Sequence, residues 1–128
     1  MNIDRAVSLI LSNAKDADSA LLAYCEAERM SLAALCNELA LAIAAQFLGK
    51  QVDFDFGDDV MNHLMGFMTS TFFLSRNENT VPEPAWSVYL AFDRGEYWNE
   101  KTDRPDETPS EKYTRPMLES LVANHSKA

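Results

Sequence analysis

Residues 60–75 contain no charged side chain, yet apolar residues recur through them at the spacing of an α-helix. On a helical wheel they form two adjacent lines, namely Val60, Leu64, Phe67, Thr71 and Leu74, and Met61, Met65, Met68 and Phe72. The remaining strip is polar but uncharged, and it consists of Asn62, His63, Gly66, Thr69 and Ser70. A helix without charge on any face is typical of a core or of a subunit contact. We therefore predict a largely buried helix over residues 58–75, capped by Gly57 or Asp58.

A second central helix is predicted over residues 31–48. Ser31 is a suitable N-cap, and Gly49 is a suitable stop. Large apolar side chains mark one face of this helix, while alanines on the other faces allow neighbouring helices to approach closely. With 47% hydrophobic residues among 128, the chain can bury a core without disulfides. The sequence thus predicts an all-α fold, a single compact domain over residues 1–128 with five or six helices, in which helices 31–48 and 58–75 are central.

Residues 82–95 have a proline-rich start and a glycine stop, which favours a further helix. Apolar residues also alternate over residues 86–92, so a strand remains the alternative there. Aromatic residues at helical spacing usually belong to the core, and we therefore assign Trp86, Tyr89 and Phe92 to it.

The connecting segments are polar or short. Polar and apolar side chains alternate over residues 51–56, as in a strand, but the sequence offers no obvious partner strand. We therefore interpret these residues as an extended connector. Residues 99–111 contain no apolar side chain larger than proline, which predicts a polar surface loop. A last helix is expected from residue 114.

Four carboxylates stand at the start of the charge-free segment, and they are Asp53, Asp55, Asp58 and Asp59. No basic residue lies between Lys50 and Arg76, although ordinary surfaces intersperse the two signs. The whole chain carries a net charge of -9. Such a charge repels phosphate, so we expect no nucleic-acid partner and no membrane partner, whereas it attracts a basic protein. Solubility and the helix dipole offer a simpler explanation for the same acids.

Tyr97 and Trp98 form a second candidate surface, because they follow the glycine stop and lie among Glu96, Asn99 and Glu100. Tyrosine and tryptophan are enriched at interface hot spots. We therefore predict a partner-binding surface made of Asp53, Asp55, Asp58, Asp59, Tyr97 and Trp98. Closure of the core is the alternative role of Tyr97 and Trp98.

A metal site is the less favoured interpretation of the acidic segment. Asp59 and His63 are four residues apart on the predicted helix and could share a divalent ion, with Asp55 as a third ligand. No second histidine accompanies them, and the segment fails the spacing of a calcium loop at its fifth, sixth and twelfth positions. We expect no cofactor, with a divalent metal on Asp55, Asp59 and His63 as the alternative.

Catalytic motifs are weak in this sequence. It has two histidines, no Gly-x-Ser-x-Gly element and no phosphate-binding loop. Cys25 and Cys36 form no CxxC motif, and we expect them to be reduced and buried. The N-terminus shows no basic segment before an apolar run, and residues 39–48 are too short to cross a bilayer, so a cytoplasmic protein is expected.

The function predicted from the sequence is that of a non-catalytic, acidic helical interaction protein that binds a basic protein, as inhibitors, immunity proteins and regulatory adaptors do. The alternative is a homodimeric helical protein with a small-ligand or divalent-metal pocket near His63, which could be enzymatic. In a homodimer the strip of Gly66, Thr69 and Ser70, or the line of methionines, would face the second subunit.

Overall fold

The computed structural model describes residues 1–12 and 17–126, and these residues form helices and loops without any strand. Seven α-helices and one π-helical turn follow each other: α1 (Ile3–Leu11), α2 (Ala17–Ala27), α3 (Leu32–Leu48), α4 (Phe54–Met68), α5 (Thr71–Arg76), α6 (Ala85–Gly95), η1 (Ser110–Thr114) and α7 (Arg115–Ser126). The all-α prediction is confirmed. The predicted number of five or six helices was too low.

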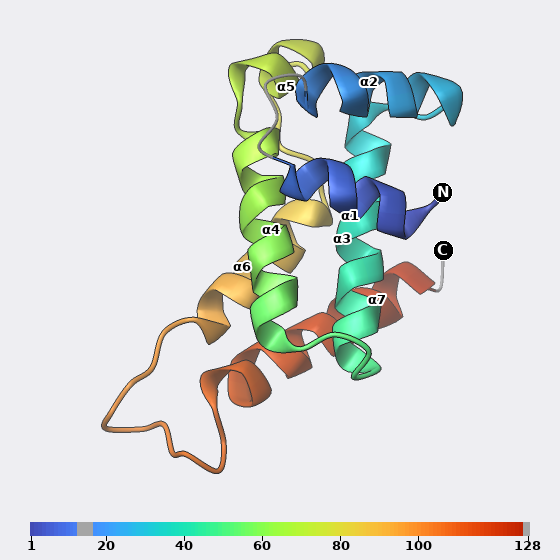
Figure 1. The fold of residues 1–128 in the computed structure, drawn as a ribbon. Coiled ribbons are helices and arrows are strands. Elements are labelled where there is room, and N and C mark those ends of the chain that lie inside the picture. Colours follow the sequence, from blue (N-terminus) through green and yellow to red (C-terminus); the bar gives the residue numbers. More distant parts are fainter. Residues whose placement is uncertain (13–16, 127–128) are drawn as a thin grey trace.

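Helices α3 and α4 stand side by side as a central pair, and α1 and α2 lie across them (Figure 1). Helix α6 packs against both members of the pair, and α7 packs against α3 and α6. The core lies between these helices, and the central pair contributes most of its fully buried side chains, among them Leu35, Leu39, Ile43, Val60, Met61, Leu64 and Met68. Apolar burial of this kind stabilises the bundle by roughly 25 cal/mol per Å² removed from water.

The predicted helix 31–48 is confirmed at both ends. The Ser31 hydroxyl accepts a hydrogen bond from the backbone N–H of Ala34 at 3.0 Å. At the other end Gly49 follows the last helical residue, Leu48. This helix was predictable because its caps and its apolar pattern agree.

The prediction of one helix over residues 58–75, preceded by an extended connector, was wrong at its start and in its continuity. Helix α4 begins at Phe54, because the Asp53 carboxylate accepts a hydrogen bond from the Phe56 N–H at 2.8 Å and caps the helix one turn earlier. The alternation of polar and apolar side chains over residues 51–56 suggested extended backbone. The N-cap at Asp53 instead makes residues 54–56 the first turn of α4. Asp55 therefore lies in the first turn of α4, and Asp58 lies one turn further along.

The hydroxyl groups of Thr69 and Ser70 divide the rest of the predicted helix into α4 and α5. Thr69 donates to the backbone carbonyl of Met65 at 2.8 Å, and Ser70 donates to that of Phe67 at 2.7 Å. Ser70 also accepts from the Phe73 N–H at 3.2 Å and so caps α5. Serine and threonine compete for backbone groups in this way, and the interruption accounts for the additional helix.

Residues 86–92 are helical, and α6 spans Ala85–Gly95. The side-chain oxygen of Asn37 on α3 accepts from the Ala85 N–H at 3.0 Å and holds the start of α6 in place. Phe92 is fully buried and Tyr89 is half-buried, but the assignment of Trp86 to the core was wrong, because this side chain is 38% exposed. Trp86 lies on the outer face of α6, and its ring is tilted by 31° against that of Tyr89, with ring centroids 5.8 Å apart.

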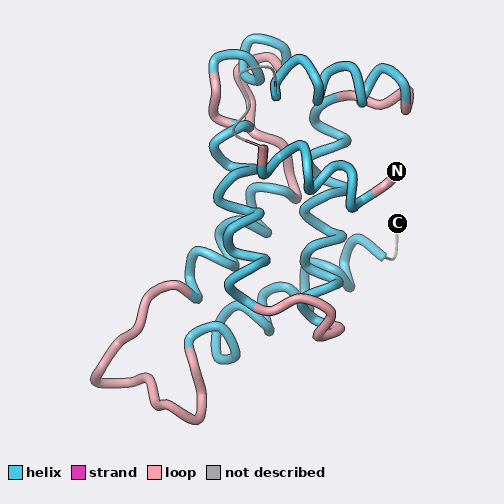
Figure 2. Tube along the Cα trace, viewed as in Figure 1, coloured by secondary structure: helices cyan, strands magenta, loops and turns pink. Residues whose placement is uncertain are grey.

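The loop after α6 extends from the bundle (Figure 2). It is polar, as predicted, but it ends before Ser110, where η1 begins, and it is not wholly a surface segment. Asp103 is only 7% exposed. Its carboxylate accepts from the Asn99 N–H at 2.8 Å and from Lys112 Nζ at 3.4 Å, which ties the loop to η1.

Among the described residues no single helix is both long and apolar enough to cross a bilayer. Helices α2 and α3 reach that length and composition only when taken together, and they are bent by 93° where they meet.

Candidate functional site

The N-terminal half of α4 lies beside the C-terminal end of α6, and this contact brings four carboxylates together. Asp55 and Asp58 come from α4, and Asp93 and Glu96 come from the end of α6. The helices approach closely because Gly57 faces Phe92: a β-carbon on Gly57 would lie 2.6 Å from a carbon of the Phe92 ring. The sequence predicted Asp55 and Asp58 as site residues and missed Asp93 and Glu96.

Asp58 is the innermost of these carboxylates. Its Oδ2 atom accepts a hydrogen bond from the Asn62 amide at 3.4 Å. Its Oδ1 atom is buried and receives no hydrogen bond from any residue that the structure describes. The Glu96 carboxylate lies within hydrogen-bonding range, so a proton held between the two acids would supply the missing bond.

Burial, followed by the charge of Glu96, raises the pKa of Asp58 to about 7. The nearby charges of Asp93 and Asp55 act in the same direction. Burial and the charge of Asp93 also raise the pKa of Glu96. Tyr89 borders the group, and burial together with Asp93 and Glu96 raises its pKa. Close carboxylates behave in this way when no opposite charge compensates them.

No lysine or arginine in the described part of the chain forms an ion pair with any of these four acids. Arg94 is their neighbour in sequence, but its guanidinium lies 3.5 Å from the ring centroid of Tyr113. The charge of the cluster is therefore available to a cation from outside the chain.

A hollow of about 360 Å³ opens beside the cluster. Its lining includes Asp53, Asp55, Glu96 and Trp98, together with Phe54 and the end of the loop before η1. Trp98 is 47% exposed. Three of the residues predicted as partner-binding, Asp53, Asp55 and Trp98, thus line one concave surface.

Three predicted members of the surface do not line this hollow, and of these Asp58 belongs to the carboxylate cluster beside it. Asp59 is turned toward His63, with its Oδ1 atom 3.4 Å from His63 Nδ1. Tyr97 does not line the hollow, but at 63% exposure it is open to solvent next to Trp98.

The predicted metal ligands do not form a cluster in the structure. Among the described residues no three histidine, cysteine, aspartate or glutamate side chains are arranged to hold a metal ion. The Nδ1 atom of His63 also lies 2.9 Å from the backbone carbonyl of Asp59, a contact within the helix. His63 lines a separate cavity of about 220 Å³ with Phe67, Ser70 and residues of α1 and α2.

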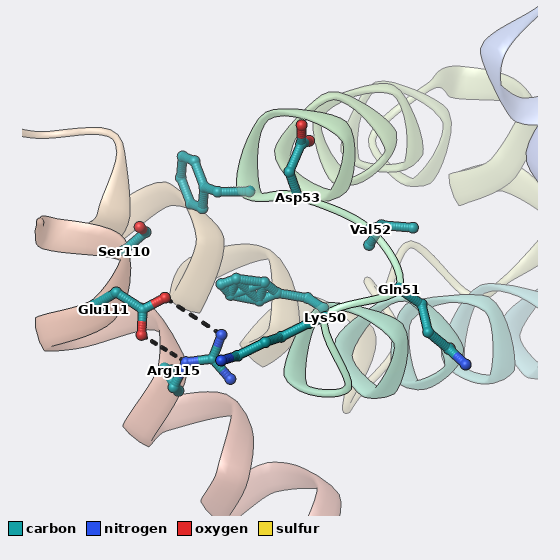
Figure 3. A pocket seen from close by; sticks show the side chains of 9 residues that line it. Lys50, Gln51, Val52, Asp53, Ser110, Glu111 and Arg115 are labelled. Atoms are coloured by element: carbon teal, nitrogen blue, oxygen red, sulfur yellow. Dashed lines mark hydrogen bonds and ion pairs between the residues drawn. The ribbon is translucent and has the colours of Figure 1, made fainter.

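A third cavity, of about 340 Å³, lies between the end of α3, the start of α4 and η1 (Figure 3). Arg115 extends into it, forms two bonds with Glu111 at 2.6 and 3.3 Å, and donates to the Leu48 carbonyl at 3.2 Å. Lys50 lies alongside Arg115, whereas the Asp53 carboxylate points away from both. These contacts use Arg115 to fix α7 to the end of α3. Asp53 forms no ion pair with either base, and its carboxylate caps α4.

Both cysteines are buried and free, as predicted. Burial is the main cause that raises the pKa of each thiol. A raised pKa disfavours the nucleophilic thiolate, and the structure therefore gives no support to cysteine catalysis.

Comparison of the chain with protein-family models, with curated proteins and with solved structures gave no match.

The acidic cluster predicts an unusual pH dependence for the variant Asp58→Asn. The folded protein holds a proton on Asp58 up to about pH 7, whereas an unperturbed aspartate has a pKa of 3.8. Between these values the folded state binds more protons, so its stability falls as the pH rises. Asparagine removes this titration. We expect the variant to match wild type at pH 4 and to gain about 1–2 kcal/mol above pH 7, a value reduced for the partial exposure of Asp58.

Urea unfolding at pH 4, 6 and 8 measures this difference. Asp4→Asn is the control, because Asp4 is an exposed acid in the first turn of α1. A stability difference between Asp58→Asn and wild type that stays constant from pH 4 to 8 would contradict the shared-proton arrangement.

Proposed function

We propose that this protein is a non-catalytic interaction protein that binds a basic protein partner through its acidic face, defined as Asp53, Asp55, Asp58, Asp93 and Glu96. The observation that carries the proposal is the convergence of carboxylates from α4 and α6 without a compensating base in the described chain. Neighbouring carboxylates repel one another and so raise one another's pKa. A lysine or arginine that approaches them stabilises their ionised form.

Binding of a basic side chain would release the proton that Asp58 holds. A nearby positive charge favours the ionised form of a carboxyl group, so the pKa of Asp58 falls in the complex. The affinity is then expected to increase between pH 6 and pH 8, as the proton becomes easier to displace. Trp98 at the hollow, and Tyr97 beside it, supply the large flat side chains that are enriched at interface hot spots.

The alternative function, a homodimer with a ligand pocket near His63, is supported by the cavity that His63 lines. The strip expected at a subunit contact includes Gly66 on α4 and Thr69 at its C-terminal cap, and both are exposed. That cavity has a smaller volume than the hollow, and its lining includes two acidic or basic side chains, Asp18 and His63. We favour the acidic face because its unpaired charge calls for an oppositely charged partner.

The proposal is tested by affinity capture from a lysate of the native cells, with two variants of equal net charge. In the acidic-face variant, Asp55→Lys with Glu96→Lys reverses two exposed acids. In the control, Glu26→Lys with Glu28→Lys reverses two exposed acids of α2 and the turn after it. Each reversal removes a negative charge and adds a positive one, so both variants change the net charge from -9 to about -5.

We expect wild type and the α2 control to retain the same basic protein at low salt, and we expect the acidic-face variant to lose it. Raising the salt concentration should weaken retention, because screening acts on exposed charges. Equal retention by all three proteins would contradict the proposal, as would capture of a partner that is itself acidic.

A further inference from the structure

We propose that the cavity between the end of α3, the start of α4 and η1 binds a small organic carboxylate with an apolar body. The inference does not rest on the proposed function, because the two bases that would hold the ligand, Lys50 and Arg115, do not belong to the acidic face.

The cavity has the size and the lining of a small-molecule site. Its volume is about 340 Å³, and sites for small ligands fall between roughly 300 and 1,000 Å³. Phe47, Val52 and Phe54 supply an apolar wall. Phe47 is only 4% exposed, so this part of the wall is firmly packed. An apolar wall beside a few polar groups is the usual composition of a ligand pocket.

The guanidinium of Arg115 is held in place and still has donors to offer. Glu111 accepts from its Nε and Nη2 atoms at 2.6 and 3.3 Å, and the Leu48 carbonyl accepts from its Nη1 atom at 3.2 Å. Its central carbon lies 4.8 Å from the ring centroid of Phe47. A guanidinium has five N–H groups, so two of them find no acceptor among the described residues. Such a group matches the two oxygens of a carboxylate.

Lys50 leaves the charge of the cavity unbalanced. Its side chain extends toward Arg115 (Figure 3), and it forms no ion pair with any residue that the structure describes. Glu111 compensates one of the two bases. The Asp53 carboxylate points away from both and caps α4. One positive charge is therefore left over at the cavity, and it attracts an anion.

The turn that carries Glu111 has an uncommon backbone geometry. Residues Ser110–Thr114 form a π-helical turn, in which the Arg115 N–H donates to the Ser110 carbonyl five residues earlier. Single π-helical turns are rare, and they occur frequently at functional sites. This turn borders the cavity, because Ser110 and Glu111 both line it. The rare geometry and the unbalanced charge thus occur at the same place.

The local charge and the apolar wall select the class of anion. The cavity has an excess of one positive charge, while the chain as a whole carries -9. A dianion or an acidic protein surface therefore meets net repulsion, whereas a small monoanion responds mainly to the charges beside it. A hydrated inorganic anion would leave the apolar wall in water, but an aromatic or branched aliphatic body covers it.

The test is a titration of isotope-labelled protein with phenylpropionate at pH 7, followed by nuclear magnetic resonance of the backbone amides. We expect saturable shifts that are largest in residues 50–54 and 110–115. The expected dissociation constant is about 1–10 mM for a ligand of this size. Phenylpropionamide has the same ring without the charge, and acetate has the charge without the ring. Each should bind at least about tenfold more weakly than phenylpropionate.

The variant Lys50→Gly separates binding from stability. Lys50 is exposed and has a φ of 59°, a left-handed conformation that glycine adopts without strain, so this variant is expected to remain folded. Arg29→Gly is the matched control. Arg29 is also an exposed base, its φ is 54°, and it does not line the cavity. We expect Lys50→Gly to weaken phenylpropionate binding about tenfold and Arg29→Gly to leave it unchanged.

Thermal unfolding followed by circular dichroism establishes that each variant is folded. The absence of saturable shifts with phenylpropionate would overturn the inference, as would equal affinities for phenylpropionate and its amide. Unchanged affinity in Lys50→Gly would exclude the lysine from the site. Equal losses in Lys50→Gly and Arg29→Gly would also contradict the inference, because the net charge of the chain would then account for the binding.

Discussion

Replacing Phe92 with alanine is expected to lower the free energy of unfolding by about 3–5 kcal/mol. Phe92 is fully buried, and its ring centroid lies 5.5 Å from that of Phe47 and 5.9 Å from that of Phe54. This one side chain therefore joins α6 to α3 and α4. Its removal would leave a cavity that the backbone of three helices can close only in part.

Urea unfolding at neutral pH measures the loss. Leu90→Ala on the same helix is the control, because Leu90 is 39% exposed and its truncation is expected to cost less than about 1.5 kcal/mol. Equal losses in the two variants would mean that the aromatic cluster does not hold the helices together. The acidic face would then lack the rigid support that its geometry requires.

Gly57→Ala is expected to destabilise the fold by about 1–3 kcal/mol, although alanine is favoured over glycine within helices by about 1 kcal/mol. The physical reason is the contact with Phe92, since the added carbon would lie 2.6 Å from one ring carbon and 2.8 Å from another. Gly66 provides the control on the same helix, because a β-carbon there meets nothing within 4 Å. Gly66→Ala should therefore stabilise the protein by about 0.5–1 kcal/mol.

The double variant Gly57→Ala with Phe92→Ala identifies the cause. If the ring is what opposes the added methyl group, Gly57→Ala becomes neutral or stabilising once Phe92 is alanine. A Gly57→Ala cost that persists in the Phe92→Ala background would show that the close approach of α4 and α6 is not determined by this contact.

The elements with unambiguous caps could be predicted from the sequence. Helix α3 has Ser31 before it, Gly49 after it and a consistent apolar face between them. The start of α4 was not predicted correctly, because four aspartates are crowded into residues 53–59 and the alternating phenylalanines there resemble a strand. Only the hydrogen bond of Asp53 distinguishes among them.

The candidate site was predictable only in the part that is contiguous in sequence. Asp53, Asp55 and Asp58 stand out because they are crowded into one segment. Asp93 and Glu96 are ordinary helix-end acids in sequence, and they join the site only because Gly57 allows α6 to approach α4. Proximity across the fold leaves no local pattern, so these two residues required the structure.

Trp86 illustrates the opposite error. Its size and its place in an apolar segment favoured the core, but α6 is amphipathic and Trp86 lies on its outer face. Helical spacing from the buried residue Val88 could have indicated this, since Trp86 lies nearly opposite it on a helical wheel.

The central claim, that the acidic face attracts a basic partner, is tested most directly by stopped-flow association rates with the captured partner at low and high salt. The variant Asp53→Asn with Asp55→Asn keeps an efficient N-cap at residue 53 and removes two charges from the hollow. Glu26→Gln with Glu28→Gln removes the same charge elsewhere. We predict association several-fold slower than wild type, with a weaker salt dependence, for the first variant only. An association rate equal to that of wild type at low salt would contradict the claim.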